Sequence, residues 1–157
     1  MGSIGVVALA VRLALATVAP AGPALPSSVT HLSPSENGPV RLVGYEFRAP
    51  AVQMSKSVTV TLYWQAQNLL LTSYKSFVHL TDARGNIVAQ SDSVPDNWTR
   101  PTTTWLPGEW VADPHRLEVN WTGPLEVWVG MYDPTTSQRL SLGRDGSGRA
   151  KLGDLLP

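Results

Sequence analysis

Apolar and polar side chains alternate through residues 57–67, SVTVTLYWQAQ. The apolar positions fall on one face of an extended chain: Val58, Val60, Leu62 and Trp64. An α-helix repeats every ~3.6 residues and would spread these side chains around its axis. The segment therefore predicts a β-strand that buries this face in a core.

Short alternating runs continue from residue 40 to residue 142, separated by Gly, Pro, Asp or Asn. This rhythm is typical of an antiparallel sandwich or barrel. We predict an all-β, immunoglobulin-like antiparallel β-sandwich of at least seven strands in two sheets, preceded by a short apolar N-terminal segment. Beside 57–67, strands are expected at 40–47, 73–82, 87–92, 116–121 and 125–133, with a short last strand after the turn at 133–134.

The most distinct hairpin runs from Phe77 to Asp92. Residues 73–82 are partly apolar on both faces, which predicts a central strand with Val78 and Leu80 buried. The following DARGN segment contains Gly85, which can adopt the positive φ that tight turns require.

Composition divides the chain into four parts. Residues 1–19 are apolar, 20–39 form a Pro-rich linker, 40–142 form the sandwich, and the Gly-rich residues 143–157 are expected to be a loose tail. Residues 4–19 are apolar except for Arg12 and Thr17, but this run is shorter than the ~20 residues that span a bilayer.

Three interpretations of the N-terminal segment remain open: the outer part of a membrane helix, an unusual signal peptide or anchor, and a soluble apolar tail. The first two place the sandwich outside the cytoplasm. We therefore expect a membrane-tethered protein on the extracytoplasmic side, at the cell surface or in the periplasm, with residues 4–19 as the membrane contact.

Twelve basic and twelve acidic residues give no net charge, so the sequence has no electrostatic footprint for nucleic acid. The chain has no cysteine, which excludes disulfides and thiolate chemistry. It also lacks a phosphate-binding Gly loop, a nucleophile elbow and a zinc-protease motif. We expect no cofactor and no enzymatic activity.

The three histidines are scattered: His31 in the linker, His79 in a central strand and His115 in an expected loop. We therefore predict no metal site. His79 is expected to pack among aromatic residues with a ring nitrogen bonded to Asp92 across the hairpin.

Most of the aspartates flank expected turns, where Asp side chains commonly bond their own backbone: Asp82, Asp92, Asp96, Asp113 and Asp133. Calcium held by loop carboxylates and a glycosidase-like carboxylate pair are weaker alternatives.

The chain is rich in tryptophan, particularly around RPTTTWLPGEW, residues 100–110. Prolines and stiff threonines suggest an extended strap across the sandwich. Trp105 and Trp110 either pack beneath this strap or contact a ligand, and packing is the favoured interpretation. Trp98 is the better candidate for an exposed ligand contact.

Four segments together resemble a known family: VTLYWQA, FVHLTDARGNIVAQSD, RPTTTWLPGEWVAD and VWVGMYDPTTSQRL. They resemble the C-terminal extracytoplasmic β-sandwich module of multi-pass bacterial membrane glycosyltransferases similar to protein mannosyltransferases. The resemblance covers residues 40–142 and implies that the apolar N-terminal segment belongs to a last membrane helix, which the module follows through a Pro-rich stretch. The catalytic multi-pass region is not among these residues, so the resemblance implies a module and not glycosyl transfer.

The leading expectation is a non-catalytic, extracytoplasmic accessory or interaction module whose partner is a membrane protein complex or a glycan. The alternative is a carbohydrate-binding domain that uses its loop tryptophans. An enzyme ranks third, since nothing pairs a nucleophile with a base.

Overall fold

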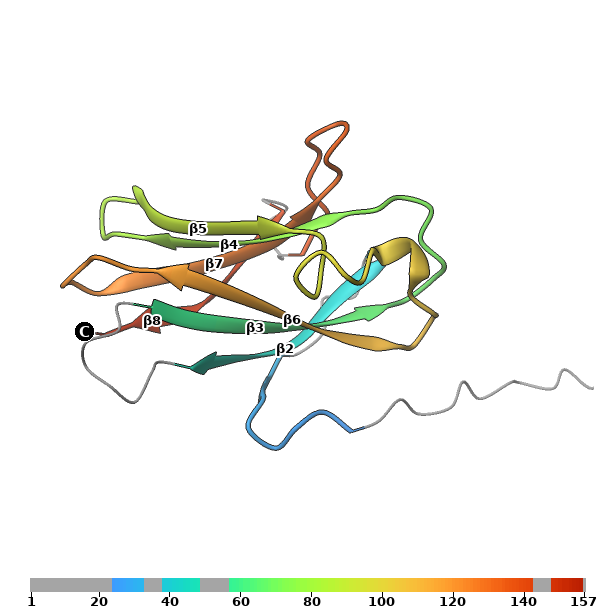
Figure 1. Ribbon diagram of the computed structural model, residues 1–157, viewed down its shortest axis with the longest axis horizontal. Helices are drawn as coiled ribbons and strands as arrows, with labels where there is room; N and C mark the ends of the chain where they lie inside the picture. Colours follow the sequence, from blue (N-terminus) through green and yellow to red (C-terminus); the bar gives the residue numbers. More distant parts are fainter. Residues whose placement is uncertain (1–23, 33–37, 49–56, 143–147, 157) are drawn as a thin grey trace, which may run out of the picture.

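The computed structural model describes residues 24–32, 38–48, 57–142 and 148–156 (Figure 1). These residues form eight β-strands and one short 3₁₀ helix, η1, but no α-helix. In chain order the elements are β1 (Thr30–His31), β2 (Val40–Arg48), β3 (Ser57–Ala66), β4 (Lys75–Thr81), β5 (Ile87–Ser93), η1 (Thr102–Thr104), β6 (Trp110–Glu118), β7 (Leu125–Tyr132) and β8 (Arg149–Leu155).

The strands form two antiparallel sheets that lie face to face, in the order β1-β2-β3-β6 and β5-β4-β7-β8 (Figure 1). If β2 to β8 are lettered A to G, the sheets are A-B-E and D-C-F-G. This is the immunoglobulin-like arrangement with the fourth strand moved to the second sheet. The predicted β-sandwich is confirmed.

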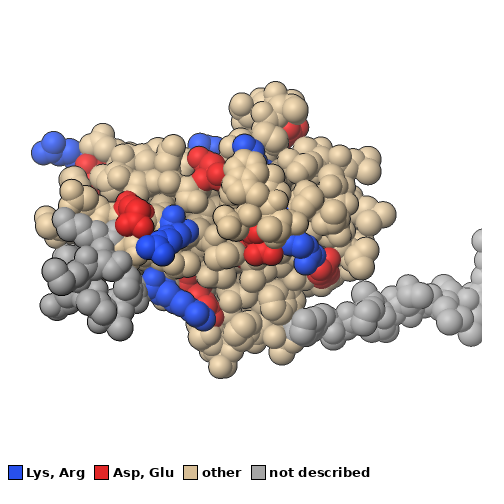
Figure 2. All heavy atoms as spheres, viewed as in Figure 1, with Lys and Arg blue, Asp and Glu red and all other residues tan. Residues whose placement is uncertain are grey.

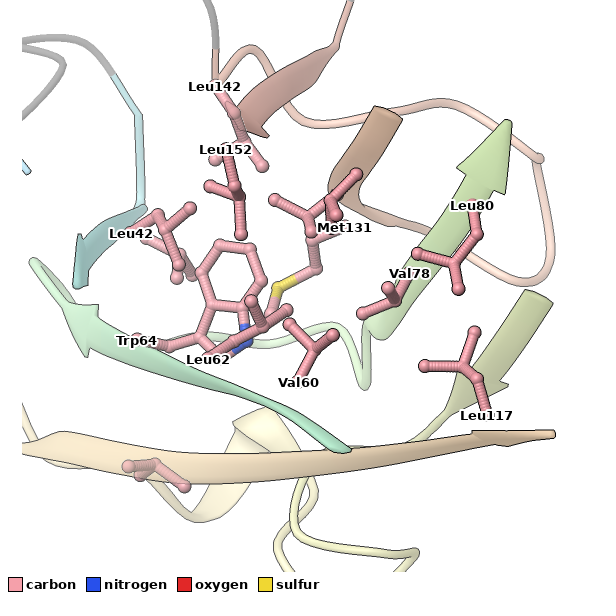
Figure 3. Close-up of a cluster of buried hydrophobic side chains, with 14 of the residues drawn as sticks. Leu42, Val60, Leu62, Trp64, Val78, Leu80, Leu117, Met131, Leu142 and Leu152 are labelled. Carbon is pink, nitrogen blue, oxygen red and sulfur yellow. The ribbon is translucent and has the colours of Figure 1, made fainter. Parts of the chain in front are cut away.

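The core lies between the sheets, where inward side chains of both interdigitate (Figure 3). All six residues predicted to be buried are buried: Val58, Val60, Leu62, Trp64, Val78 and Leu80. The indole of Trp64 lies among Leu42, Leu152 and Met131 in this cluster. Period-two alternation therefore identified the correct face of β3 and β4.

The predicted hairpin is confirmed. Phe77 lies opposite Asp92 in the β4–β5 pair, and Gly85 in the turn has φ +82°. β4 lies between β5 and β7. Its outward Phe77 is buried because the ring packs over Gly130 of β7.

Part of the predicted linker packs on the sandwich. Val29 is buried and Thr30 pairs with Tyr45 of β2. Gly44 permits this approach, because a Cβ there would overlap the Val29 side chain and lie 2.9 Å from the Thr30 carbonyl oxygen. A Pro-rich composition therefore did not prevent residues 29–31 from docking against a strand edge.

The prediction of a loose tail is wrong for Arg149–Leu155, which form β8 and pair with β7. Backbone hydrogen bonds to β7 hold this strand, Leu152 enters the core, and a bulge at Val127/Trp128 accommodates the irregular register. Glycine content alone did not predict a loose tail correctly. Gly148 instead turns the chain, at φ +67°, just before the strand begins.

β6 begins at Trp110, six residues before the predicted strand at 116–121. Asp113-Pro114 suggested a loop, but Pro114 lies in the strand with an exposed side chain. Proline is tolerated there because β6 is at the edge of its sheet, where a missing N–H donor breaks no ladder bond.

None of the described residues forms a helix that is long and apolar enough to cross a membrane. The apolar segment 1–19 lies outside the described residues.

Candidate functional site

The outer face of the β5-β4-β7-β8 sheet carries aromatic and charged side chains. Lys75, Phe77 and His79 alternate outward on β4 and lie opposite Tyr132, Gly130 and Trp128 of β7, respectively. On β8, the Arg149 guanidinium lies 4.1 Å from the Trp128 ring centre. Strand alternation thus places aromatic rings and cations side by side.

A hollow of about 300 Å³ opens on this face. Its lining comes from three strands and the loop after β7: Phe77, His79, Gln90, Asp92, Tyr132, Ser137 and Arg139. Phe77 forms the buried floor, where its ring occupies the space that a side chain at Gly130 would fill. The hollow is at the small end of the range for small-molecule sites, which begins near ~300 Å³.

The loop at residues 133–138 supplies one wall of the hollow. Asp133 accepts the Thr135 N–H over 2.8 Å, and Asp133 N–H donates to the Gln138 carbonyl over 2.9 Å. This turn reverses the chain direction and places the Arg139 guanidinium 5.0 Å from the Phe77 ring centre. A cation therefore covers the aromatic floor without filling the hollow.

His79 and Asp92 face each other in the hollow, with Nε2 and Oδ1 separated by 3.9 Å. Burial lowers the pKa of His79 below its ordinary value; Asp92 partly offsets this shift, while Arg139 and Arg149 add to it. The imidazole is therefore neutral at pH 7 and offers one hydrogen-bond donor and one acceptor.

Tyr132 contributes a phenol whose pKa is raised by burial and by the nearby charge of Asp92. The hollow thus combines a carboxylate, a guanidinium, a phenol, a neutral imidazole, an amide and a hydroxyl over an aromatic floor. Such a set can both donate to and accept from a polar ligand.

Trp98 lies at the edge of the same face, 58% exposed, with the Lys75 Nζ 4.6 Å from its ring centre. Asp96, Asn97 and Trp98 all have positive φ, at 54°, 52° and 71°. Non-glycine residues in this conformation are strained by about 1–3 kcal/mol each and persist only where the surroundings hold them.

Hydrogen bonds hold this loop: Trp98 N–H donates to the Val94 carbonyl over 2.9 Å, and Arg100 N–H to the Pro95 carbonyl over 3.0 Å. Lys75 lies directly opposite Tyr132, which lines the hollow. Trp98, Lys75, Tyr132 and the hollow therefore form one continuous surface, named here the binding face. The binding face contains both Trp98 and the His79 and Asp92 pair, which the sequence analysis singled out separately.

Trp105 is not available to a ligand, because its side chain is only 1% exposed and its Nε1 donates to the Arg100 carbonyl. The expectation that Trp105 contacts a ligand is wrong, and the favoured packing interpretation holds. The strap is also not fully extended, since Thr102–Thr104 form η1 and direct Trp105 into the core.

Trp110 lies on the opposite side of the sandwich. It starts β6 and packs against Tyr63 of β3, with ring centres 5.6 Å apart and an edge-to-face geometry. Both residues project outward from the β1-β2-β3-β6 sheet, because their neighbours Trp64 and Val111 are in the core. Trp98 and Trp110 therefore cannot contact the same small ligand.

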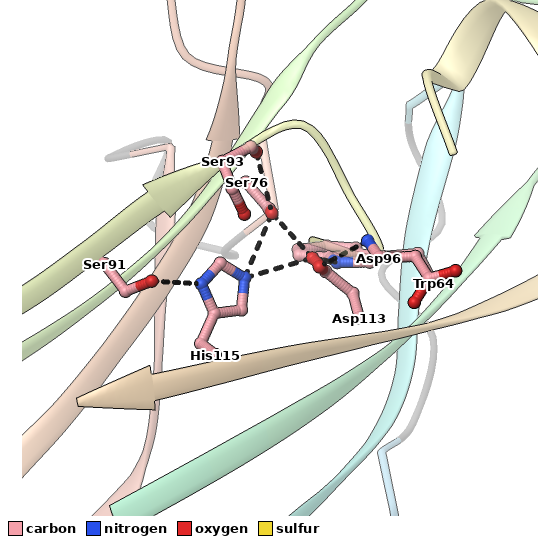
Figure 4. Close-up of polar contacts among 7 residues, drawn as sticks. All are labelled: Trp64, Ser76, Ser91, Ser93, Asp96, Asp113 and His115. Carbon is pink, nitrogen blue, oxygen red and sulfur yellow. Dashed lines mark hydrogen bonds and ion pairs between the residues drawn. The ribbon is translucent and has the colours of Figure 1, made fainter. Parts of the chain in front are cut away.

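A buried polar cluster that the sequence did not predict lies between the sheets (Figure 4). Asp113 Oδ2 accepts hydrogen bonds from Trp64 Nε1 over 3.1 Å and from Ser76 Oγ over 2.6 Å, and lies 3.1 Å from His115 Nε2. His115 Nδ1 lies 3.0 Å from the Ser91 hydroxyl. Asp113 and His115 were expected in a turn and a loop, but they point inward from β6.

The Ser, His and Asp side chains of this cluster do not form a catalytic triad. A triad places serine and carboxylate on opposite ring nitrogens. Ser76 Oγ lies 3.1 Å from His115 Nε2, the nitrogen that also faces Asp113, and Ser91 Oγ faces Nδ1. A triad has its carboxylate on Nδ1 and its serine on Nε2, the reverse of the Asp113 and Ser91 positions. Ser76, Asp113 and His115 are closed to solvent and Ser91 is half-buried, so the cluster joins the two sheets from within.

Within the described part of the chain, no three His, Cys, Asp or Glu residues gather in a way that could hold a metal ion. No protein-family model, curated protein or solved structure matches the chain.

Proposed function

We propose that this protein is a non-catalytic, extracytoplasmic β-sandwich module that is tethered to a membrane and binds its partner through the binding face. The observation that carries the proposal is the continuity of Trp98, Lys75, Tyr132 and the hollow on one side of one sheet. Strain at Trp98 supports it, because strained residues cluster where a side chain must be presented.

The opposite face offers a contrast that makes the proposal testable. Outward residues there include Trp110, which packs against Tyr63, and Arg116, which pairs with Glu118 at 3.2 Å. The hollow is on the other face, where Gln90 is exposed at its rim. Gln90 and Arg116 are both exposed and both lie on edge strands, so they form a matched pair of probe positions.

Photo-crosslinking in intact cells tests which face makes contact. Because the native chain has no cysteine, Gln90→Cys and Arg116→Cys each carry a single benzophenone label. Adducts from position 90 and none from position 116 are expected. Equal crosslinking from both positions, or crosslinking only from position 116, would show that the binding face is wrongly assigned.

A second candidate function is carbohydrate binding, which the exposed ring of Trp98 favours. Sugar rings stack on rigid aromatic surfaces, and Asp92, Gln90 and Arg139 supply acceptors and donors for hydroxyl groups. One stacking ring supports only weak affinity, with dissociation constants on the order of millimolar to tens of micromolar.

A glycan array followed by calorimetry distinguishes this candidate. Binding that disappears in Trp98→Ala but persists in Trp110→Ala would support it, because only Trp98 is on the binding face. Loss of binding in Trp110→Ala alone would place the sugar on the other sheet.

The tether is proposed from the apolar residues 4–19 and the Pro-rich stretch that follows. External protease added to intact cells, or to cells with a permeabilised outer membrane, is expected to digest the sandwich. Digestion that requires opening of the cytoplasmic membrane would contradict the extracytoplasmic location.

A further inference from the structure

Two neighbouring loops form one end of the sandwich: residues 67–74 between β3 and β4, and residues 101–109 before β6 (Figure 1). Thr102 Oγ1 donates to the Thr72 carbonyl over 2.6 Å and accepts the Tyr74 N–H over 3.0 Å. Gly108 N–H also donates to the Ala66 carbonyl over 2.8 Å. The two loops therefore form a single surface, named here the apolar end.

Three leucines project from the apolar end into solvent: Leu69 is 68% exposed, Leu71 is 96% exposed and Leu106 is 65% exposed. Isolated exposed apolar residues are common, but three on adjoining loop tips form a patch. Because the loop contacts fix their relative positions, the leucines are presented together.

The tips of the apolar end carry no charged residue, and the one charge in its two loops, Glu109, pairs with Arg100 at 2.6 Å. Residues 66–74 and 101–108 contain no Lys, Arg, Asp or Glu. Charged side chains of both signs are scattered over the surface seen in Figure 2, and some of them lie near this end. The turn at the other end of β4 contains Asp82 and Arg84, so the two ends differ in polarity.

Several backbone groups of residues 101–109 are bonded within that loop. Thr104 N–H donates to the Pro101 carbonyl over 2.9 Å, Trp105 N–H to the Thr102 carbonyl, and Glu109 N–H to the Leu106 carbonyl over 3.0 Å. The Leu106 N–H donates to the Glu109 side chain over 2.9 Å. Internal bonding lowers the cost of removing the 101–109 loop from water.

We propose that the apolar end docks into the interfacial region of a lipid bilayer, with Leu69, Leu71 and Leu106 inserted among the acyl chains. A fluid bilayer accepts three protruding tips without a matching cavity, whereas a protein partner would need a complementary groove. Uncharged tips suit this environment, because buried charge is costly there.

The inference rests on the proposed tether, which keeps the sandwich near a membrane. Residues 20–28 connect the apolar segment to the docked Val29 and can span at most about 30 Å when fully extended. Such a short connection raises the effective concentration of the apolar end at the membrane surface, so weak insertion suffices.

Single-cysteine labelling of the full chain in phosphatidylcholine vesicles tests the proposal. Leu71→Cys places an environment-sensitive NBD fluorophore at the apolar end, and Ile87→Cys places the same fluorophore beyond the charged turn, at a residue that is 50% exposed. Flotation of the vesicles reports the tether, and quenching by aqueous iodide and by doxyl-labelled lipid reports the environment of each label.

The expected result is a blue-shifted NBD emission at position 71, loss of its iodide quenching and gain of doxyl-lipid quenching, with position 87 unchanged. Flotation with both labels still quenched by iodide would overturn the docking while leaving the tether intact. Protection of position 71 from iodide without doxyl-lipid quenching would mean a protein contact and would also overturn it. Failure to float would contradict tether and docking together.

Discussion

The backbone N–H of Asp96 donates to Oδ1 of the buried Asp113 carboxylate over 2.9 Å. Asp96 begins the strained loop that presents Trp98, and Asp113 is the centre of the cluster that joins the two sheets. A single carboxylate therefore supports both the sandwich and one edge of the binding face.

Replacing Asp113 by alanine is expected to lower the free energy of unfolding by about 3–5 kcal/mol, since it leaves buried donors without their acceptor. Those donors include Trp64 Nε1, Ser76 Oγ and the Asp96 N–H. Urea unfolding measures the change. Glu118→Ala at an exposed ion pair is the control, and a similar small loss in both variants would show that the cluster contributes little.

Acid should destabilise the protein through Asp113. Burial opposes its ionisation, but hydrogen bonds from His115 and Ser76, the charge of His115 and the Asp96 N–H together lower its pKa. Because the pKa is depressed in the folded state, this stabilisation is complete above the unfolded value of about 4 and is lost as pH falls through the folded value.

Unfolding midpoints from pH 7 to pH 2 measure this dependence. The slope below about pH 4 is expected to be steeper in the wild-type protein than in Asp113→Asn, which cannot ionise at this position. Identical slopes in the two proteins would mean that other carboxylates dominate acid unfolding.

The two tryptophans of the 94–109 region should respond differently to truncation. Trp105→Ala removes a fully buried ring and is expected to cost about 3–5 kcal/mol. Trp98→Ala removes an exposed ring with one cation contact and should cost less than about 1 kcal/mol. If denaturant unfolding showed equal losses of unfolding free energy in the two variants, the Trp98 ring would be part of the packed structure and not an exposed contact.

Backbone strain at Trp98 predicts an unusual order of stability. Because φ is +71° there, Trp98→Gly is expected to be about 1 kcal/mol more stable than Trp98→Ala, the reverse of the order in helices and strands. Thermal unfolding of the two variants measures the difference. Alanine equal to or better than glycine would show that the left-handed conformation at this position is wrong.

The strands of the fold were predictable wherever side chains alternate. Val58 to Trp64 mark the core because one face of β3 is apolar, and on β4 Val78 and Leu80 alternate with the outward Phe77 and His79. β8 was not predictable in this way, because its Gly-containing sequence relies on backbone pairing with β7. The start of β6 was predicted too late in the chain because Asp113-Pro114 is a frequent turn pair. Proline is acceptable there only because the strand lies at the edge of its sheet.

The candidate site was predictable in part. Trp98 was singled out for exposure and is exposed. His79 and Asp92 do line one hollow, but His79 lies opposite Gln90, and its Nε2 is 3.9 Å from Asp92 Oδ1, too far for the expected hydrogen bond. Tyr132, Ser137 and Arg139 were missed, because β7 and the loop after it are long-range neighbours of β4 and not local ones. Asp113 and His115 do alternate with Val111 and Leu117, so the inward period was present but was carried by polar residues.

The central claim is that one outer face of the sandwich makes the functional contact. Rates of maleimide alkylation at single cysteines test it most directly, because the chain has no other thiol. Gln90→Cys at the hollow and Arg116→Cys on the opposite sheet are compared in purified protein and in native membranes. We predict that position 90 reacts more slowly in native membranes than in the purified protein, while position 116 reacts equally in both. An unchanged rate at position 90 with slower reaction at position 116 would contradict the account.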